Sequence, residues 1–189
     1  MFVQPSAADT DDEPVRSLGV HDSWWTVGAA SVLACLTLAA CAWISPHLHA
    51  DPALHAAALF VHLAALVLGF GAVLAADYHG LLWITGRCTM RETVAVTGRL
   101  HLPIWAGLAG LVASGVILHP DLTAVPTRVK LALVLVLTLN GLQAGLLGRR
   151  VAKDTSATPR ILAWAGATAL ISQACWWGAM VIGFSNTQS

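Results

Sequence analysis

The chain has 189 residues, of which 57% are hydrophobic and only 11% are charged, and its mean hydropathy is +0.70. This composition excludes an ordinary soluble globular domain and indicates an integral membrane protein. The formal net charge is zero and the ten Lys and Arg residues are scattered along the chain, which argues against nucleic acid as a partner. The lipid bilayer is the expected partner.

Five apolar segments are long enough to span a bilayer, which takes about 20 residues each. They cover residues 24–44, 56–84, 94–118, 129–147 and 161–184. The sequence therefore predicts an all-α fold, with one domain over residues 23–185 that forms an integral membrane bundle of five transmembrane helices. Residues 1–22, which include Asp9, Asp11, Asp12 and Glu13, are expected to form a disordered acidic tail.

The distribution of cations predicts the orientation of the bundle, because cytoplasmic connections are enriched in Lys and Arg. Most of the cations fall in the tail and around the second and fourth connections: Arg16, Arg87, Arg91, Arg99, Arg149, Arg150, Lys153 and Arg160. Arg128 and Lys130 fall on the opposite side. We therefore expect a bacterial cytoplasmic (inner) membrane protein with its N-terminus in the cytoplasm and its C-terminus outside. Tryptophans near the segment ends, Trp176 and Trp177 among them, are expected to be interfacial anchors.

Three groups that lipid disfavours, His62, Asp77 and His79, lie inside the second apolar segment. If the second and third segments form an antiparallel hairpin closed around residue 90, His62 lies level with His119, and His79 lies level with His101. The two levels are then roughly 25 Å apart, at about 1.5 Å per residue. Neutral imidazole is a common ligand of haem iron and copper. These four histidines are therefore the candidate metal ligands for a b-type haem or copper in a redox or metal-handling role.

Two residues of the fourth segment extend this candidate site. Lys130, a cation at the start of a helix, could pair with an anion such as a haem propionate, and Asn140 adds an amide to the polar interior. A simpler interpretation applies to the histidines near the membrane surfaces and to Lys130, because polar side chains there reach water or headgroups without any function. His62 differs, since an ionisable group within the apolar core is by default a candidate for function.

Two other functional classes stay open. The protein could be a non-catalytic structural or accessory membrane subunit, whose glycine-rich helix faces dock a partner in a larger membrane complex or a second copy in a homo-oligomer. It could also be a proton-coupled transporter with a cytoplasmic relay, although the chain shows no inverted repeat of the kind that transporters often have. The relay would consist of Asp77, His79, Arg99 and His101.

One long region resembles a known group of proteins. The stretch FVHLAALVLGFGAVLAADYHGLLW at residues 60–83, followed by WAGLAGLVASGVILHPDLTAVPTRVKLALVLVLTLNGL at residues 105–142, is similar to small bacterial membrane proteins of the copper-resistance-D and J-type protoporphyrinogen oxidase group. The resemblance covers roughly residues 55–150. It implies a helical bundle, and the oxidases of the group bind b-type haem and act on a porphyrinogen. His62 and His79 would match the first and last histidines of the ligand helix, and Lys130 would match a lysine that opens a later helix.

The chain departs from the oxidase pattern at two points. Where the oxidases have an Arg shortly before the second His, this chain has Ala76 and Asp77. Where they have a His late in the Lys-bearing helix, it has Asn140. These differences argue against porphyrinogen oxidation and indicate a relative of unassigned activity rather than a member that carries out the oxidases' reaction.

Overall fold

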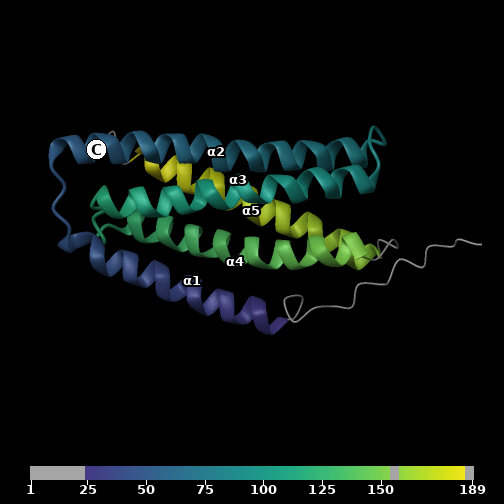
Figure 1. Cartoon of the computed structure of the whole chain (residues 1–189), viewed down its shortest axis with the longest axis horizontal. Coiled ribbons are helices and arrows are strands. Elements are labelled where there is room, and N and C mark those ends of the chain that lie inside the picture. The colour runs from purple at the N-terminus through teal and green to yellow at the C-terminus, as the bar shows by residue number, and fades with distance from the viewer. Residues whose placement is uncertain (1–23, 154–157, 186–189) are drawn as a thin grey trace, which may run out of the picture.

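A computed structural model of the protein describes residues 24–153 and 158–185. They form α1 (Trp24–Ile44), α2 (Pro52–Ile84), α3 (Met90–Ile117), α4 (Val125–Lys153) and α5 (Pro159–Ser185), with a short 3-10 helix, η2 (Ser45–His47), after α1 (Figure 1). Within these ranges there is no strand, and all five α-helices are long and apolar enough to cross a membrane. The predicted all-α fold with five membrane-spanning helices is confirmed, while the predicted tail at 1–22 lies outside the described residues.

Helices α2 and α3 begin before the apolar segments do, because polar caps extend them. The Asp51 carboxylate accepts a hydrogen bond from Leu54 N at 2.7 Å, and Pro52 occupies the first turn of α2, both of which favour a helix start. Before α3, Thr89 and Glu92 form a capping box, in which each side chain binds the backbone of the other residue. As a result the α2–α3 connection is reduced to residues 85–89.

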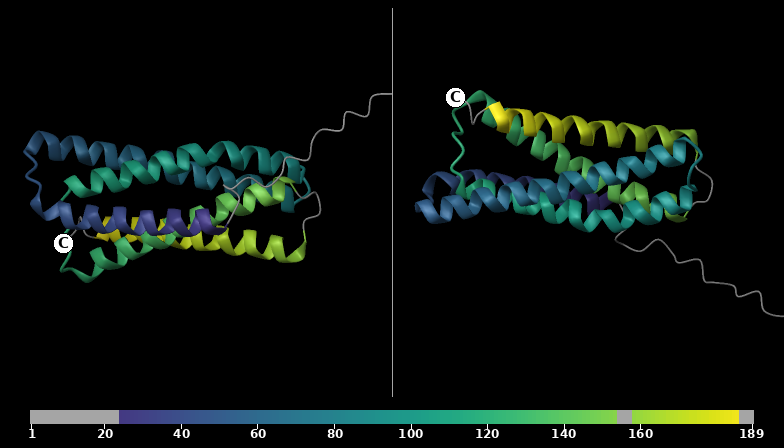
Figure 2. Two further views of the ribbon diagram at one scale, coloured as in Figure 1. Left: turned by 60° about the horizontal axis from the view of Figure 1, so that its bottom comes forward. Right: turned by 90° about the horizontal axis from the view of Figure 1, so that it is seen from above.

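Successive helices run antiparallel and pair into two hairpins, α2 with α3 and α4 with α5, while α1 packs against α4 and α3 (Figures 1 and 2). The α2–α3 and α4–α5 connections lie at one end of the bundle, where Trp24 and Trp164 stack with ring centroids 5.6 Å apart. We call this the arginine end, because Arg87, Arg91 and Arg149 lie near it. The opposite end, with the 48–51 and 118–124 connections, is called the histidine end, after His47, His49 and His119.

Glycines bring the backbones of α2 and α3 into direct contact. A Cβ atom on Gly107 would lie 2.4 Å from Gly69 Cα and 2.7 Å from Ala65 O, so no larger residue fits there without separating the helices. Close approach through small residues is a usual way for helices to associate in a bilayer, where lipid removes the hydrophobic driving force. This seam fixes which residues of the two helices face each other.

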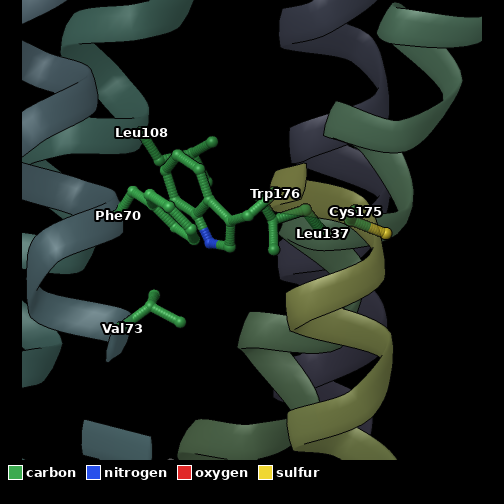
Figure 3. Packing of buried hydrophobic residues seen from close by; sticks show 6 residues of the cluster. All are labelled: Phe70, Val73, Leu108, Leu137, Cys175 and Trp176. Carbon is green, nitrogen blue, oxygen red and sulfur yellow. The ribbon is translucent and has the colours of Figure 1, made fainter. Parts of the chain in front are cut away.

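The two hairpins meet through large side chains rather than through close backbones. Trp176 of α5 is only 2% exposed and packs against Phe70 of α2, with ring centroids 5.7 Å apart. Around it lies a core cluster that Figure 3 shows in detail: Phe70, Val73, Leu108, Leu137, Cys175 and Trp176. The prediction that Trp176 is an interfacial anchor is therefore wrong, because its indole fills the space between the hairpins. Toward the histidine end the hairpins diverge (Figure 2, right).

Candidate functional site

The imidazole of His62 is held against α3 by a buried serine. His62 Nδ1 lies 2.9 Å from Ser114 Oγ, and Ser114 is only 3% exposed. Ser114 Oγ also lies within hydrogen-bond distance of Gly110 O. Because the serine has a single hydroxyl proton, we infer that it donates to Gly110 O and accepts from a protonated His62 Nδ1, which leaves the lone pair of the ring on Nε2.

The ring of His62 lies beside Gly115 as well as Ser114, and the Cβ position of Gly115 is 3.8 Å from His62 Cε1. The prediction that His62 lies level with His119 is therefore wrong by about one helical turn. The error came from placing the hairpin closure at residue 90. Because the capping box starts α3 at Met90, the connection is centred on residue 87, and every pairing across the seam moves accordingly.

Lys130 brings a cation from α4 toward the same region. Its side chain is half-buried, and Nζ lies 3.5 Å from the Cβ position of Gly183 on α5. Within the described ranges no hydrogen bond or ion pair of Lys130 is found. We call His62, Ser114 and Lys130 the His62 site.

The other three candidate histidines, His79, His101 and His119, form hydrogen bonds outside the His62 site. His119 follows α3 with a positive φ of 48°, and its exposed Nε2 donates to Leu48 O at 2.6 Å, so it ends the helix and ties it to the preceding connection. His79 and His101 each donate from Nδ1 to a carbonyl four residues earlier on their own helix. Among the described residues there is no group of three or more His, Cys, Asp or Glu side chains that could hold a metal ion.

Asn140, which the sequence suggested as a further cofactor-binding residue, connects α4 to α5. Its side chain is 8% exposed, and Nδ2 donates to Thr168 O of α5 at 2.8 Å. A buried amide that bonds to a neighbouring helix satisfies its own polar groups and ties the two helices together. The structure thus gives Asn140 a packing contact and does not place it beside His62 or Lys130.

The four residues of the predicted relay are not connected to one another. Asp77 of α2 accepts a hydrogen bond from Gln173 Nε2 of α5, and Gln173 Oε1 accepts one from Trp177 Nε1 at 2.9 Å. In the part of the chain that the structure describes, no hydrogen bond or ion pair joins any two of Asp77, His79, Arg99 and His101. The Asp77–Gln173 pair instead bridges the two hairpins inside the membrane-spanning region.

Two residues of these networks, Ser114 and Gln173, were not assigned a role from the sequence. Ser114 is a small residue of a kind that is common where membrane helices pack, and Gln173 does not reveal its partner because it lies 96 positions from Asp77. A partial signal was present, since the Thr89–Glu92 capping box indicates that α3 starts at Met90, which moves the residue level with His62 from His119 toward the N-terminal part of α3. No comparable local signal exists for Gln173.

Comparison with known proteins adds no assignment: no protein-family model matches the chain, and neither a curated protein nor a solved structure matches it at a significant level. The resemblance to the copper-resistance-D and J-type oxidase group therefore stays a prediction. The function has to be argued from the His62 site itself.

Proposed function

We propose that this multi-pass membrane protein binds a b-type haem through His62 and takes part in electron transfer. The observation that supports this most strongly is the hydrogen bond from His62 Nδ1 to Ser114 Oγ. Metal-binding histidines usually donate their second ring nitrogen to a neighbouring acceptor, which fixes the tautomer and orients the ring. Ser114 supplies that acceptor from a buried position on α3.

The available donors suit haem better than copper. A porphyrin supplies four nitrogen ligands of its own, so a single histidine is sufficient to hold the iron from one side. A copper ion would need several protein ligands, and His119, the expected companion of His62, uses its Nε2 to bind Leu48 O. Copper binding therefore requires donors that the His62 site does not contribute, whereas haem binding does not.

Lys130 is the second element that supports this proposal. A half-buried ammonium group without a counterion is costly in an apolar environment, and an anionic group such as a haem propionate would compensate it. A haem at His62 would not fit within the α2–α3 seam itself, because the contact between Gly69 and Gly107 closes it.

Each residue of the site has a separate task in this proposal. A bound haem would supply an iron that accepts and releases single electrons. His62 would hold the iron through Nε2, Ser114 would keep the Nδ1 proton in place, and Lys130 would neutralise the charge of a propionate. The apolar helices around the site would limit the access of water, which tunes the potential of a redox centre.

We infer the location and orientation from the charges. Arg87, Arg91 and Arg149 lie near one end of the bundle, which supports a cytoplasmic arginine end and an outward-facing histidine end. In a bacterial inner membrane the His62 site would then lie in the outer half of the bilayer. Assembly into a homo-oligomer or a larger membrane complex stays a prediction.

Haem titration of the detergent-purified protein tests the proposal, with the Soret band as the signal. We expect saturation at one haem per chain for the wild type and a loss of binding for His62→Ala. His55→Ala is a matched control, because His55 lies two turns away on the same helix and is exposed. A wild-type protein that takes up no haem, or a His62→Ala protein that binds haem as the wild type does, would contradict the proposal, and a protein that binds neither haem nor copper would favour an accessory subunit.

A further inference from the structure

A groove separate from the His62 site lies between α1, α3 and α4, toward the arginine end. Its volume is about 410 Å³, which is within the range of small-molecule pockets in proteins. Apolar side chains and glycines make up most of its walls, among them Val27, Ala30, Trp105, Gly141 and Leu142. No Asp or Glu side chain is among the described residues that line it. The groove therefore suits a ligand that is largely apolar.

The groove also contains a hydrogen-bond acceptor, the Nε2 nitrogen of His101. His101 Nδ1 lies 3.2 Å from the backbone oxygen of Thr97. Because a carbonyl oxygen can only accept, Nδ1 carries the proton of the neutral ring and Nε2 carries the lone pair. Within the described ranges no hydrogen bond of Nε2 is found. Thr26 and Arg149 line the groove as well, but each already has an interaction of its own, so the polar atom left for a ligand is an acceptor.

Two glycines of α4 keep the space next to this acceptor open. His101 Nε2 is 3.7 Å from the Cβ position of Gly145, so a larger side chain there would fill the space in front of the nitrogen. Trp105, one turn further along α3, has its Cζ2 atom 3.3 Å from the Cβ position of Gly141. An indole offers a flat surface against which a second aromatic ring can pack. The acceptor and an aromatic wall thus lie side by side.

The depth of His101 in the membrane favours a neutral ligand. His101 lies about two turns, or roughly 10 Å, inside the apolar segment at residues 94–118. An acceptor without a donor is costly in apolar surroundings, and a hydroxyl group satisfies it without bringing a charge into the bilayer. A ligand that matches all of these features has a hydroxyl on an aromatic ring, no charge, and an apolar tail.

We propose that the groove binds the headgroup of a membrane hydroquinone. One ring hydroxyl would donate a hydrogen bond to His101 Nε2, which requires an oxygen about 2.8 Å from the nitrogen. The ring would pack against Trp105, and the apolar tail would lie along Val27 and Ala30 of α1. A hydroquinone is neutral and has two hydroxyl donors, whereas its dimethyl ether has the same ring and tail without a donor. This site goes beyond haem binding and does not depend on it.

Anaerobic calorimetric titration of the detergent-purified protein tests the proposal, with a decyl-substituted benzohydroquinone and its dimethyl ether as probes. We expect one hydroquinone per chain, bound about tenfold more tightly than the ether, since one hydrogen bond is worth about that much. His101→Phe should remove this preference, and Gly145→Leu should weaken the binding of both probes by filling the groove.

The matched controls change similar residues outside the groove. His79→Phe replaces a histidine that also donates from Nδ1 to its own helix, and Gly148→Leu replaces a glycine of α4 with nothing within 4 Å of its Cβ position. Both should bind the hydroquinone as the wild type does. Circular dichroism of all four variants shows whether each keeps its helix content.

Several results would overturn the proposal. Equal binding of the hydroquinone and its ether would show that no hydroxyl bonds to His101, and an equal loss in His101→Phe and His79→Phe would indicate a general effect on the bundle. Unchanged binding in Gly145→Leu would place the ligand elsewhere. Equally tight binding of decanol would mean that the groove does not select an aromatic ring, and a loss of haem binding in His101→Phe would assign Nε2 to iron instead.

Discussion

Replacing Gly107 by alanine is expected to weaken the bundle and the His62 site together. The new Cβ atom would lie 2.4 Å from Gly69 Cα, whereas carbon atoms in favourable contact are about 3.5–4.0 Å apart. Because backbone atoms are on the other side, no change of rotamer can relieve the clash, and the helices must move apart by about 1 Å or more. Overpacking of this kind costs about 1–3 kcal/mol. A separation of that size would also break the 2.9 Å contact between His62 and Ser114.

The assay is reversible unfolding in mixed micelles, combined with haem titration of the same samples. Gly71→Ala is the matched control, because Gly71 lies on α2 with nothing within 4 Å of its Cβ position, and alanine there should be neutral or stabilise the helix by up to about 1 kcal/mol. We expect Gly107→Ala to be less stable than the wild type and to bind haem more weakly. If Gly107→Ala unfolds and binds haem as Gly71→Ala does, the described contact between α2 and α3 is wrong.

Four further substitutions test three separate contacts. Ser114→Ala should reduce haem affinity about tenfold while His62 stays in place, because outer hydrogen bonds to metal ligands have effects of about that size; an unchanged titration would show that the serine does not orient the ring. Asp77→Leu and Gln173→Leu should each destabilise the protein in micelles, and the double mutant should show a coupling of about 1 kcal/mol, whereas additive effects would mean that no hydrogen bond joins the hairpins there. Thr89→Ala should cost about 1 kcal/mol of unfolding free energy through loss of the capping box, and an unaltered unfolding curve would contradict that role.

The sequence was sufficient to predict the class of fold, because long apolar segments in a chain with few charges allow little other than a helical membrane bundle. The ends of the helices were predicted less well. Hydropathy detects the part of a helix that lies in the bilayer, whereas the observed starts of α2 and α3 are set by Asp51 and by Thr89 with Glu92. These polar caps extend each helix beyond its apolar segment.

The role of the candidate site residues stays a prediction. What the structure adds is the contact of His62 Nδ1 with Ser114 Oγ of α3, which the sequence did not identify. The pairing of His62 with His119 failed because a shift of a few residues in the hairpin closure moves every facing pair by about one turn. Contacts between the hairpins, such as Asp77 with Gln173 and Phe70 with Trp176, could not be predicted from the sequence, because each joins residues that are far apart in the chain.

The most direct test of the central claim is the metal content of the protein purified from its native membrane. We predict about one iron per chain, carried by a b-type haem with a Soret band, and loss of both in His62→Ala, while His55→Ala retains them. Wild-type protein that contains no haem iron, or His62→Ala protein that retains the wild-type iron content, would contradict the assignment of His62 as the haem ligand.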